Sequence, residues 1–408
     1  MVSDPGRVPN VKAVSQNGFT LDMFGRLKVG EGFSLFDSQH RFQDCGLFSD
    51  ETSGTASATY LPNESTVALS VGTASGDSIS RETRRVLPYQ PGKSLQIMLT
   101  YVLNQTKAGL RQRVGYFSRQ NGIFLEVDGS DIYLVKRSYV SGSVVDTRVA
   151  QADWNVERLL GDGKTDHTLD LSKAQIMFIE VEWLGVGSVR VGFMFNGVPI
   201  VVHRFDHANN VTSVYMTTSV LPLRFELENT SSTASSSTMK QICTSVISNG
   251  GYFRALLSYT ATRGVTTVTT AYKPLVAIRM ATGRTDAVII PSDVSIFPTS
   301  DGDFDWALFR NPSDLTGGTW VTHPDNPSVE YNISASSMTG GTVIQEGFFG
   351  ASNQSSSPVI GGDVRNFSFQ LGRTNSNTPV SDVMVLAVKK SDSGTGTVKS
   401  SLGWYDLI

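Results

Sequence analysis

Apolar and polar residues alternate along the middle of the chain in short runs that turn-forming pairs separate. Three successive runs, at residues 111–117, 123–127 and 132–140, are separated by Asn121-Gly122 and Asp128-Gly129. Asn-Gly and Asp-Gly between apolar-rich runs favour a type I′ hairpin turn, because both central residues of that turn need a positive φ. The pattern predicts consecutive antiparallel strands.

The same pattern continues through residue 205 and predicts a sandwich of two packed sheets over residues 55–230. The runs 175–183, 188–195 and 198–205 are joined by a glycine-containing turn and by Asn196-Gly197. Residues 153–160 are the one helix-permissive window in this part, opened by an aspartate that could cap it. Two further alternating runs lie at residues 66–71 and 95–103.

A second block of short strands follows a stretch that is rich in serine and threonine. Residues 231–250 are interpreted as a linker and connecting strand because 231–237 are almost entirely Ser, Thr and Ala. Residues 251–408 show no long helical window, so a C-terminal β-sandwich domain is expected. Its predicted strands are 264–272, 275–280, 287–290, 304–310, 319–323 and 383–388.

The first 54 residues differ from both blocks because they are aromatic and have little regular pattern. Gly25, Gly30, Gly32 and Gly46 interrupt the segment, and a helix would tolerate these glycines poorly. We interpret residues 1–54 as an attachment arm. It is expected to pack either on its own sandwich or on a neighbouring subunit.

Composition narrows the function classes further. The net charge is −3 and only 17% of the residues are charged, so the chain lacks the basic footprint of a nucleic-acid-binding protein. Cys45 and Cys243 are the only cysteines and lie far apart, which gives no disulfide framework and no paired-cysteine metal site. Residues 1–14 contain no apolar core of a signal peptide, and no run is long enough to predict membrane insertion. No cofactor is predicted.

Glu180 and Glu182 are the first candidates for chemistry. They lie two residues apart on a predicted strand, so both side chains project from the same face. Paired carboxylates of this kind occur in jelly-roll glycosidases as acid and nucleophile. The next residues, 184–187, add no further carboxylate, and a solvent-facing strand is the favoured interpretation.

His203, Asp206 and His207 group two imidazoles and a carboxylate at the end of a predicted strand. Zinc uses such ligands, but a catalytic zinc site needs a further well-placed ligand and no motif supplies one. A hydrogen-bonded strand end is therefore preferred.

Asp301, Asp303 and Asp305 are the best metal candidates in the chain. Calcium prefers clustered oxygen ligands, and these three carboxylates alternate with Gly302 and Phe304. The spacing does not match an EF-hand, so a polar loop that enters a strand is the favoured alternative.

Trp320, Trp404 and Tyr405 are the candidates for carbohydrate binding. Aromatic side chains of the second domain could form a surface on which sugar rings stack, and these three are the proposed binding residues. Most aromatic residues of a sandwich belong to its core, which is the alternative.

The strand order resembles that of the concanavalin A-like jelly roll, which includes laminin G-type modules. A long strand, two hairpins, a loop, a long apolar strand and an Asn-Gly hairpin carry the resemblance, with residues 180–183 and the strands at 189–195 and 198–203 in the central hairpin region. This resemblance implies an all-β fold, a jelly-roll sandwich followed by a second sandwich. The fold hosts lectins, hydrolases and inert modules alike, so it implies no single function.

Five short motifs resemble virion structural proteins of tailed bacteriophages, of the type described as tail fibres or appendages. The motifs are Phe24-Gly-Arg-Leu27, Tyr89-Gln-Pro-Gly-Lys93, Glu182-Trp-Leu-Gly-Val-Gly187, Leu221-Pro-Leu-Arg224 and Gly403-Trp-Tyr-Asp-Leu407. The resemblance implies a component of the virion, assembled in the host cytoplasm, in a tail, collar or head appendage. Its implied partners are other virion proteins and further copies of itself, with a trimer favoured.

Three functions follow from the sequence. The leading prediction is a non-enzymatic structural or adhesive virion protein. The second is a carbohydrate-binding module that recognises a host surface glycan. The third is a glycoside hydrolase that uses Glu180 and Glu182.

Overall fold

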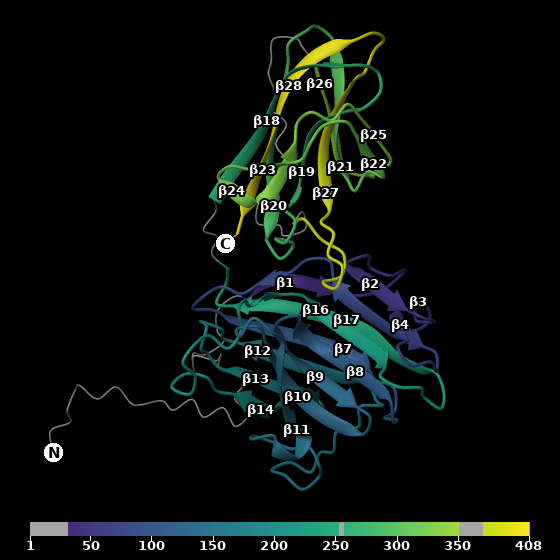
Figure 1. Cartoon of the computed structure of the whole chain (residues 1–408), viewed down its shortest axis with the longest axis vertical. Helices are drawn as coiled ribbons and strands as arrows, with labels where there is room; N and C mark the ends of the chain where they lie inside the picture. The colour runs from purple at the N-terminus through teal and green to yellow at the C-terminus, as the bar shows by residue number, and fades with distance from the viewer. Residues whose placement is uncertain (1–31, 253–256, 351–369, 408) are drawn as a thin grey trace, which may run out of the picture.

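The computed structural model describes residues 32–252, 257–350 and 370–407, and almost all of its regular structure is β-strand. Two β-sandwiches lie one above the other along the long axis (Figure 1). The prediction of an all-β fold with two consecutive sandwiches is confirmed.

The first sandwich contains one sheet of eight strands in the order β14-β13-β12-β7-β17-β4-β3, with β1 also paired to β17. β17 is the central strand, because β7 lies along one side of it and β4 and β1 share the other side. The strands are β1 (Phe33–Ser38), β3 (Ser57–Leu61), β4 (Thr66–Val71), β7 (Ser94–Val102), β12 (Gln175–Val181), β13 (Val189–Phe195), β14 (Val198–Phe205) and β17 (Ser237–Asn249).

The opposing sheet has seven strands in the order β11-β10-β9-β8-β16-β5-β2. All of its neighbours run antiparallel. The strands are β2 (Phe48–Ser53), β5 (Ser78–Thr83), β8 (Leu110–Phe117), β9 (Gly122–Asp128), β10 (Asp131–Ser138), β11 (Val145–Ala150) and β16 (Leu223–Asn229). A separate two-stranded pair joins β6 (Leu87–Pro88) to β15 (Val220–Leu221).

The predicted hairpins form, but only one of the two Asn-Gly pairs makes the predicted turn. Asn196 and Gly197 have φ values of 52° and 79° and connect the paired residues Phe195 and Val198, as a type I′ turn requires. At the other pair, Phe117 faces Gly122 directly, so the turn consists of residues 118–121 and Gly122 already belongs to β9.

The boundaries of the first sandwich lie further out than the sequence predicts. Residues 33–53 of the predicted arm pack on the chain's own sandwich, one of the two expected alternatives, because β1 pairs with β17 and β2 pairs with β5. Within the predicted linker and connecting strand, residues 237–249 do form a strand, but it belongs to the eight-stranded sheet of the first sandwich. The helix expected at 153–160 does not form, and the 3-10 helix η1 (Gln151–Asp153) is the only helix in the described part of the chain. The first 31 residues of the predicted arm lie outside the described residues.

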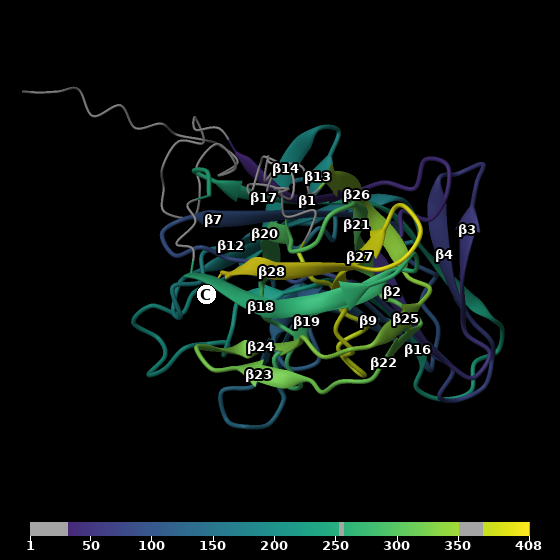
Figure 2. The same ribbon diagram turned by 90° about the horizontal axis from the view of Figure 1, so that it is seen from above.

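The second sandwich packs a three-stranded sheet, β18-β28-β20, against a six-stranded sheet, β23-β24-β19-β27-β21-β26. Figure 2 shows β18, β28 and β20 side by side. A two-stranded pair, β22 with β25, completes it. The strands are β18 (Leu257–Val268), β19 (Lys273–Met280), β20 (Ile289–Pro298), β21 (Asp303–Arg310), β22 (Asp314–Thr316), β23 (Val321–His323), β24 (Asn326–Asn332), β25 (Ser337–Thr339), β26 (Thr342–Gly350), β27 (Val383–Lys390) and β28 (Gly396–Asp406).

Each sandwich has its own apolar core between its two sheets. Alternation along β9 illustrates the packing: Ile123, Leu125 and Val127 point into the first core and are almost completely buried. The first core also takes in Val288 and Leu407 of the second sandwich, so apolar contact continues across the junction of the domains.

Candidate functional site

The outer face of the seven-stranded sheet carries charged side chains at the positions that alternate with the core. On β9 the residue between Leu125 and Val127 is Glu126, which is completely buried although it points away from the core. Arg113 of β8 lies opposite Glu126, and Glu226 of β16 lies opposite Arg113. Opposite charges on adjacent strands are therefore in register.

Seven side chains on this face form a continuous series of ion pairs, which we call the ion ladder. It starts at Arg148 on β11, crosses the sheet to Glu82 on β5, and ends at Arg373 of the second domain. The N–O distances are 2.5 Å for Arg148–Glu126, 2.6 Å for Arg113–Glu126, 3.1 Å for Arg113–Glu226, 2.6 Å for Arg224–Glu226, 2.5 Å for Arg224–Glu82 and 2.6 Å for Arg373–Glu82.

The arginines of the ion ladder keep its carboxylates ionised. Burial alone would raise the pKa of Glu226, but the charges of Arg224 and Arg113 outweigh burial and lower that pKa to about 2. Burial also opposes ionisation of Glu126, and its hydrogen bonds and charge contacts with Arg148 and Arg113 again hold the pKa below its usual value. Neither carboxyl group carries a proton at neutral pH. They are therefore poor general acids and serve as fixed acceptors for arginine.

Two stacked aromatic rings contact arginine side chains on this outer face. Phe117 and Phe124 stack with their ring centroids 4.3 Å apart and are completely buried on this outer face. The guanidinium groups of Arg137 and Arg113 lie 5.0 and 5.6 Å from the centroid of Phe124. Cation–π contact of this kind adds to the ion pairs and restricts the arginine side chains.

Residues 370–382, which precede β27 and which we call the strap, fasten the second domain to this face. They lie between the two sandwiches in Figure 1, drawn in yellow. The Asn375 amide donates to the carbonyl and hydroxyl oxygens of Ser80 at 3.0 and 2.6 Å. The Ser376 hydroxyl donates to Glu82 at 2.7 Å, and the Arg224 guanidinium donates to Asn375 at 2.9 Å. These groups are buried or half-buried, so the contact is a specific polar interface.

A cavity of about 470 Å³ lies beside the strap, where both domains contribute walls. We call it the junction cavity. Arg119, Gln120 and Tyr139 line it from the first domain, and Asp286 and Asn377 line it from the second. A smaller cavity of about 220 Å³ lies along β5 and β16 and also reaches Asn377. Asn377 of the strap therefore lines both cavities.

Glu180 lies on β12 and Glu182 follows its last residue, and neither faces solvent. Glu180 is completely buried and Glu182 is 8% exposed. Ser94 donates a hydrogen bond to Glu180 at 2.9 Å, and Arg190 pairs with it at 2.6 Å. The solvent-facing interpretation is wrong, because the ion pair makes a buried carboxylate tolerable. Ser94 and Arg190 together occupy both oxygens of Glu180.

His203 and His207 are buried and face different partners. The His203 Nδ1 accepts a hydrogen bond from the backbone N–H of Asn155 at 3.2 Å. The His207 Nδ1 lies 2.6 Å from the Gly187 carbonyl oxygen, to which it donates when that nitrogen carries the proton. Burial lowers the pKa of both imidazoles to about 4. Their ligand atoms do not form a metal-binding group with Asp206 among the described residues. The predicted hydrogen-bonded strand end describes them well.

Asp301, Asp303 and Asp305 do not converge on one point in the described structure, so the calcium prediction is not supported. Their carboxylates form no group of potential metal ligands. Asp305 instead pairs with Lys389 at 3.1 Å and accepts a hydrogen bond from Ser391. A lysine at this position supplies the positive charge that a calcium ion would otherwise provide.

Trp320, Trp404 and Tyr405 do not share a surface. Trp404 is completely buried in the core between the two sheets, so the prediction that it binds sugar is wrong. Tyr405 is its neighbour on β28 and therefore points to the opposite side, the outer face of the three-stranded sheet. Trp320 packs with Phe309 and Val385 on the outer face of the six-stranded sheet, where Arg279 lies 4.3 Å from its ring centroid.

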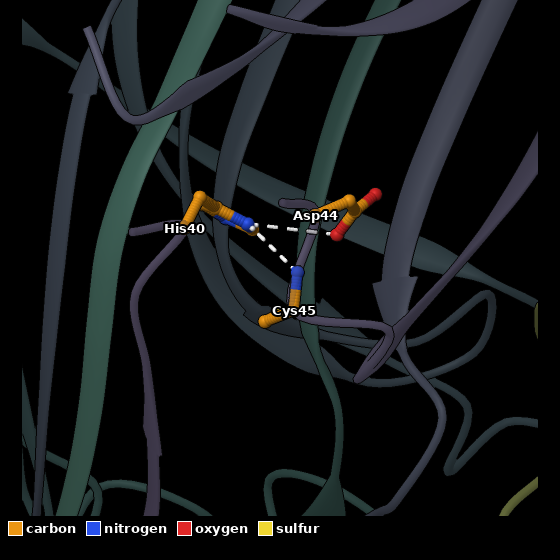
Figure 3. A group of neighbouring side chains, drawn as sticks. All are labelled: His40, Asp44 and Cys45. Carbon is orange, nitrogen blue, oxygen red and sulfur yellow. Dashed lines mark hydrogen bonds and ion pairs between the residues drawn. The ribbon is translucent and has the colours of Figure 1, made fainter. Parts of the chain in front are cut away.

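One group in the described residues has a potential metal-ligand set that the sequence did not indicate. His40, Asp44 and Cys45 bring their ligand atoms within 4.8 Å of one another (Figure 3). Both Asp44 and the Cys45 amide approach the same ring nitrogen of His40, at 3.5 and 3.2 Å. Arg81 also donates to both oxygens of Asp44 at 2.6 and 2.7 Å. A guanidinium on the carboxylate opposes a metal cation, so this group is a structural ion-pair cluster.

The sequence interpretation missed the ion ladder and the strap. A signal for the ladder was present, because β16 reads Arg224, Glu226 and Glu228 at alternate positions between apolar residues. Alternation along an extended segment would have placed these charges on one face. The strap has no comparable signal, since residues 373–377 look like an ordinary polar loop.

The chain matches no known family and no curated protein. Several solved structures are similar to about half of it. The carbohydrate recognition domain of Emp47p is 11% identical, covers 53% of this chain and 95% of its own, and gives a TM-score of 0.33. A GH16 protein of Bacteroides ovatus, in complex with a G4G4G3G product, is 11% identical over 52% and 99%, with a TM-score of 0.35. The CBM2 module of the evolved Dit of Lactobacillus casei BL23 phage J-1 is 7% identical over 55% and 99%, with a TM-score of 0.33.

These similarities are too weak to transfer a function. The sandwich architecture of this chain follows from its own strand pairing, described above. Within the described residues, no helix has the length and apolarity that crossing a membrane requires.

Proposed function

We propose that this protein is a non-enzymatic structural component of a tailed-bacteriophage virion, in which it forms a tail, collar or head appendage. In this proposal it assembles as a homo-oligomer, with a trimer favoured, and contributes to host attachment. The five sequence motifs provide the link to virion proteins. The structural observation that carries the proposal is the strap, which joins two sandwiches through buried charges.

A buried polar interface of this kind suits a structural protein whose domains keep a fixed relative position. Domains in one chain usually move relative to each other unless their interface is large or specific. Here Arg224 and Arg373 bind Glu82 from both domains at once, and all three side chains are at most 4% exposed. Rotation of one domain would leave buried charges without partners, which costs several kcal/mol. The two sandwiches should therefore behave as one rigid body.

Exposed aromatic residues supply candidate contacts between copies. Phe42 is 81% exposed and Phe348 is 80% exposed, far more than is usual for phenylalanine. Phe348 lies on β26, an edge strand of the six-stranded sheet. An edge strand with an exposed apolar residue is suited to pairing with another chain.

The test is the oligomeric state of the full chain, measured by light scattering coupled to size-exclusion chromatography. We expect a closed homo-oligomer, and we expect loss of assembly when residues 1–31 are removed. The cut leaves β1 and β2 in place, so the first sandwich keeps all of its strands. Phe348→Ser should weaken assembly, whereas Val380→Ser should not, although Val380 is also exposed (64%).

A monomeric full chain, or a shortened chain that assembles unchanged, would contradict the assembly part of the proposal. Imaging of the particle with a labelled copy of the protein tests the virion part. Absence of the label from purified particles would contradict it.

Hydrolysis of a polysaccharide is the enzymatic alternative and has its own test. If Glu180 and Glu182 were catalytic, wild type would cleave a polysaccharide and Glu182→Gln would not. We expect no cleavage by either protein.

A further inference from the structure

The junction cavity has the position and size of a ligand site that the structural role leaves unused. Its volume of about 470 Å³ lies within the range of small-molecule sites, which occur preferentially where domains meet. It opens between the turn at residues 118–121, the end of β10 and the strap. Neither sandwich alone provides all of these walls.

The floor of the junction cavity is apolar, and an aromatic ring stands at its side. Leu221 and Pro222 are buried and form part of the floor together with Val86. Tyr139 follows β10 and lines the cavity while remaining partly exposed. An apolar floor and a tyrosine ring suit a ligand with flat apolar faces and a polar rim.

Several polar side chains that line the cavity have donors or acceptors that no other described residue uses. The side chains of Arg119, Gln120 and Asp286 make no hydrogen bond or ion pair with any other residue in the described ranges. Asn377 accepts a hydrogen bond from Arg224 at 3.1 Å through its oxygen, and its amide nitrogen remains available to donate. The cavity thus offers donors from Arg119 and Asn377, an acceptor from Asp286 and both from Gln120.

We propose that the junction cavity binds an oligosaccharide. Sugar hydroxyls both donate and accept, which matches the mixture of amide, guanidinium and carboxylate groups around the rim. The C–H faces of a pyranose ring match Tyr139 and the apolar floor. A nucleotide or phosphorylated ligand would leave Asp286 facing a second negative charge, which disfavours that class.

The strap makes this site bipartite. Asn377 belongs to the strap, whose neighbouring residues Asn375 and Ser376 bind Ser80 and Glu82 of the first domain. Docking of the domains therefore places Asn377 in the lining of the same cavity as Arg119 and Gln120 before any ligand arrives. Such preorganisation reduces the entropy that a ligand must lose on binding. The inference rests on the host-attachment part of the proposed function and assigns it a ligand class and a location.

The test uses the full chain on a printed array of neutral and acidic bacterial oligosaccharides, followed by calorimetry with the strongest hit. Tyr139→Ala removes the ring, and Gln120→Ala removes an exposed amide whose loss leaves the fold intact. We expect each substitution to weaken binding about tenfold or more. Tyr133→Ala on the same hairpin, outside the cavity, serves as the matched control and should change affinity less than about twofold.

Two outcomes would overturn the inference. One is the absence of binding to every oligosaccharide by correctly folded full-length protein. The other is binding that Tyr139→Ala and Gln120→Ala leave unchanged, which would place the sugar elsewhere, for example at Trp320 or Tyr405. The oligomeric state of the same samples separates this result from the assembly proposal. An intact oligomer that binds no glycan overturns the site and leaves the structural role standing.

Discussion

Arg373 of the second domain lies 2.6 Å from Glu82 of the first domain, and both side chains are almost completely buried. The two residues are 291 positions apart in the chain, yet they close an ion ladder that extends from β11 to β5 of the seven-stranded sheet. A positive charge from the second domain therefore belongs to the buried ion pairs of the first domain.

Removal of Glu82 should show how strongly this interface depends on buried charge. Glu82→Ala leaves Arg224 and Arg373 buried without their shared partner, so we expect a loss of ~3 kcal/mol in the free energy of unfolding. Urea denaturation measures it. Arg158→Ala is the control, because its pair with Asp162 is exposed and should be worth less than about 1 kcal/mol. Equal effects of the two substitutions would refute the buried role of Glu82.

Stability should fall in mildly acidic solution because of the buried histidines. Burial lowers the pKa of His203 and His207 to about 4, below the value of about 6.5 in an unfolded chain. The folded state therefore binds fewer protons, and its stability is complete above pH 6.5 and decreases as the pH falls toward 4. Between pH 7.5 and 5.5 we expect a loss of roughly 1 kcal/mol for each histidine. Urea denaturation at both pH values measures the loss.

His207→Gln provides the matching variant, since glutamine does not titrate. Its stability should change less between the two pH values than that of wild type. An identical pH dependence in the two proteins would show that His207 is not responsible.

The two tryptophans first considered for sugar binding should respond differently to substitution. Trp404→Ala removes a completely buried side chain and should destabilise the protein by ~3 kcal/mol or more. Trp320→Ala should cost about 1 kcal/mol, because that ring is partly exposed and mainly contacts Arg279 and the cluster around Phe309. Thermal unfolding distinguishes the two. A Trp404→Ala protein as stable as wild type would contradict the placement of Trp404 in the core.

The cluster of His40, Asp44 and Cys45 should not depend on a metal ion. Arg81 occupies both carboxylate oxygens of Asp44, so neither zinc nor a chelator should change the melting temperature. Asp44→Asn should destabilise the protein, because Arg81 is 1% exposed and would lose an ionic partner. A rise in melting temperature with zinc, absent in His40→Asn, would argue for a metal site.

The local pattern of residues was sufficient to predict strands that pair with the next strand along the chain. The β13–β14 hairpin was predicted within a residue at both ends, because Asn196-Gly197 allows the positive φ values that the turn needs. Pattern failed for β17, whose Ser/Thr-rich beginning looks like a linker but whose partners, β4 and β7, lie far away in the chain. The composition of a strand does not reveal that it will be central in a sheet.

The candidate site also combines features that local sequence predicts with features that depend on the tertiary structure. The sequence alone determined the all-β class and the consecutive strands in the middle of the chain, because alternation along a strand and turn-forming pairs are local properties. Only the tertiary structure decided that Arg113 pairs with both Glu126 and Glu226, that Trp404 is core, and that residues 370–382 cross to the first domain. Those outcomes depend on register between strands and on docking between domains. Both are set by contacts between residues that are distant in sequence, where no local pattern reports the partner.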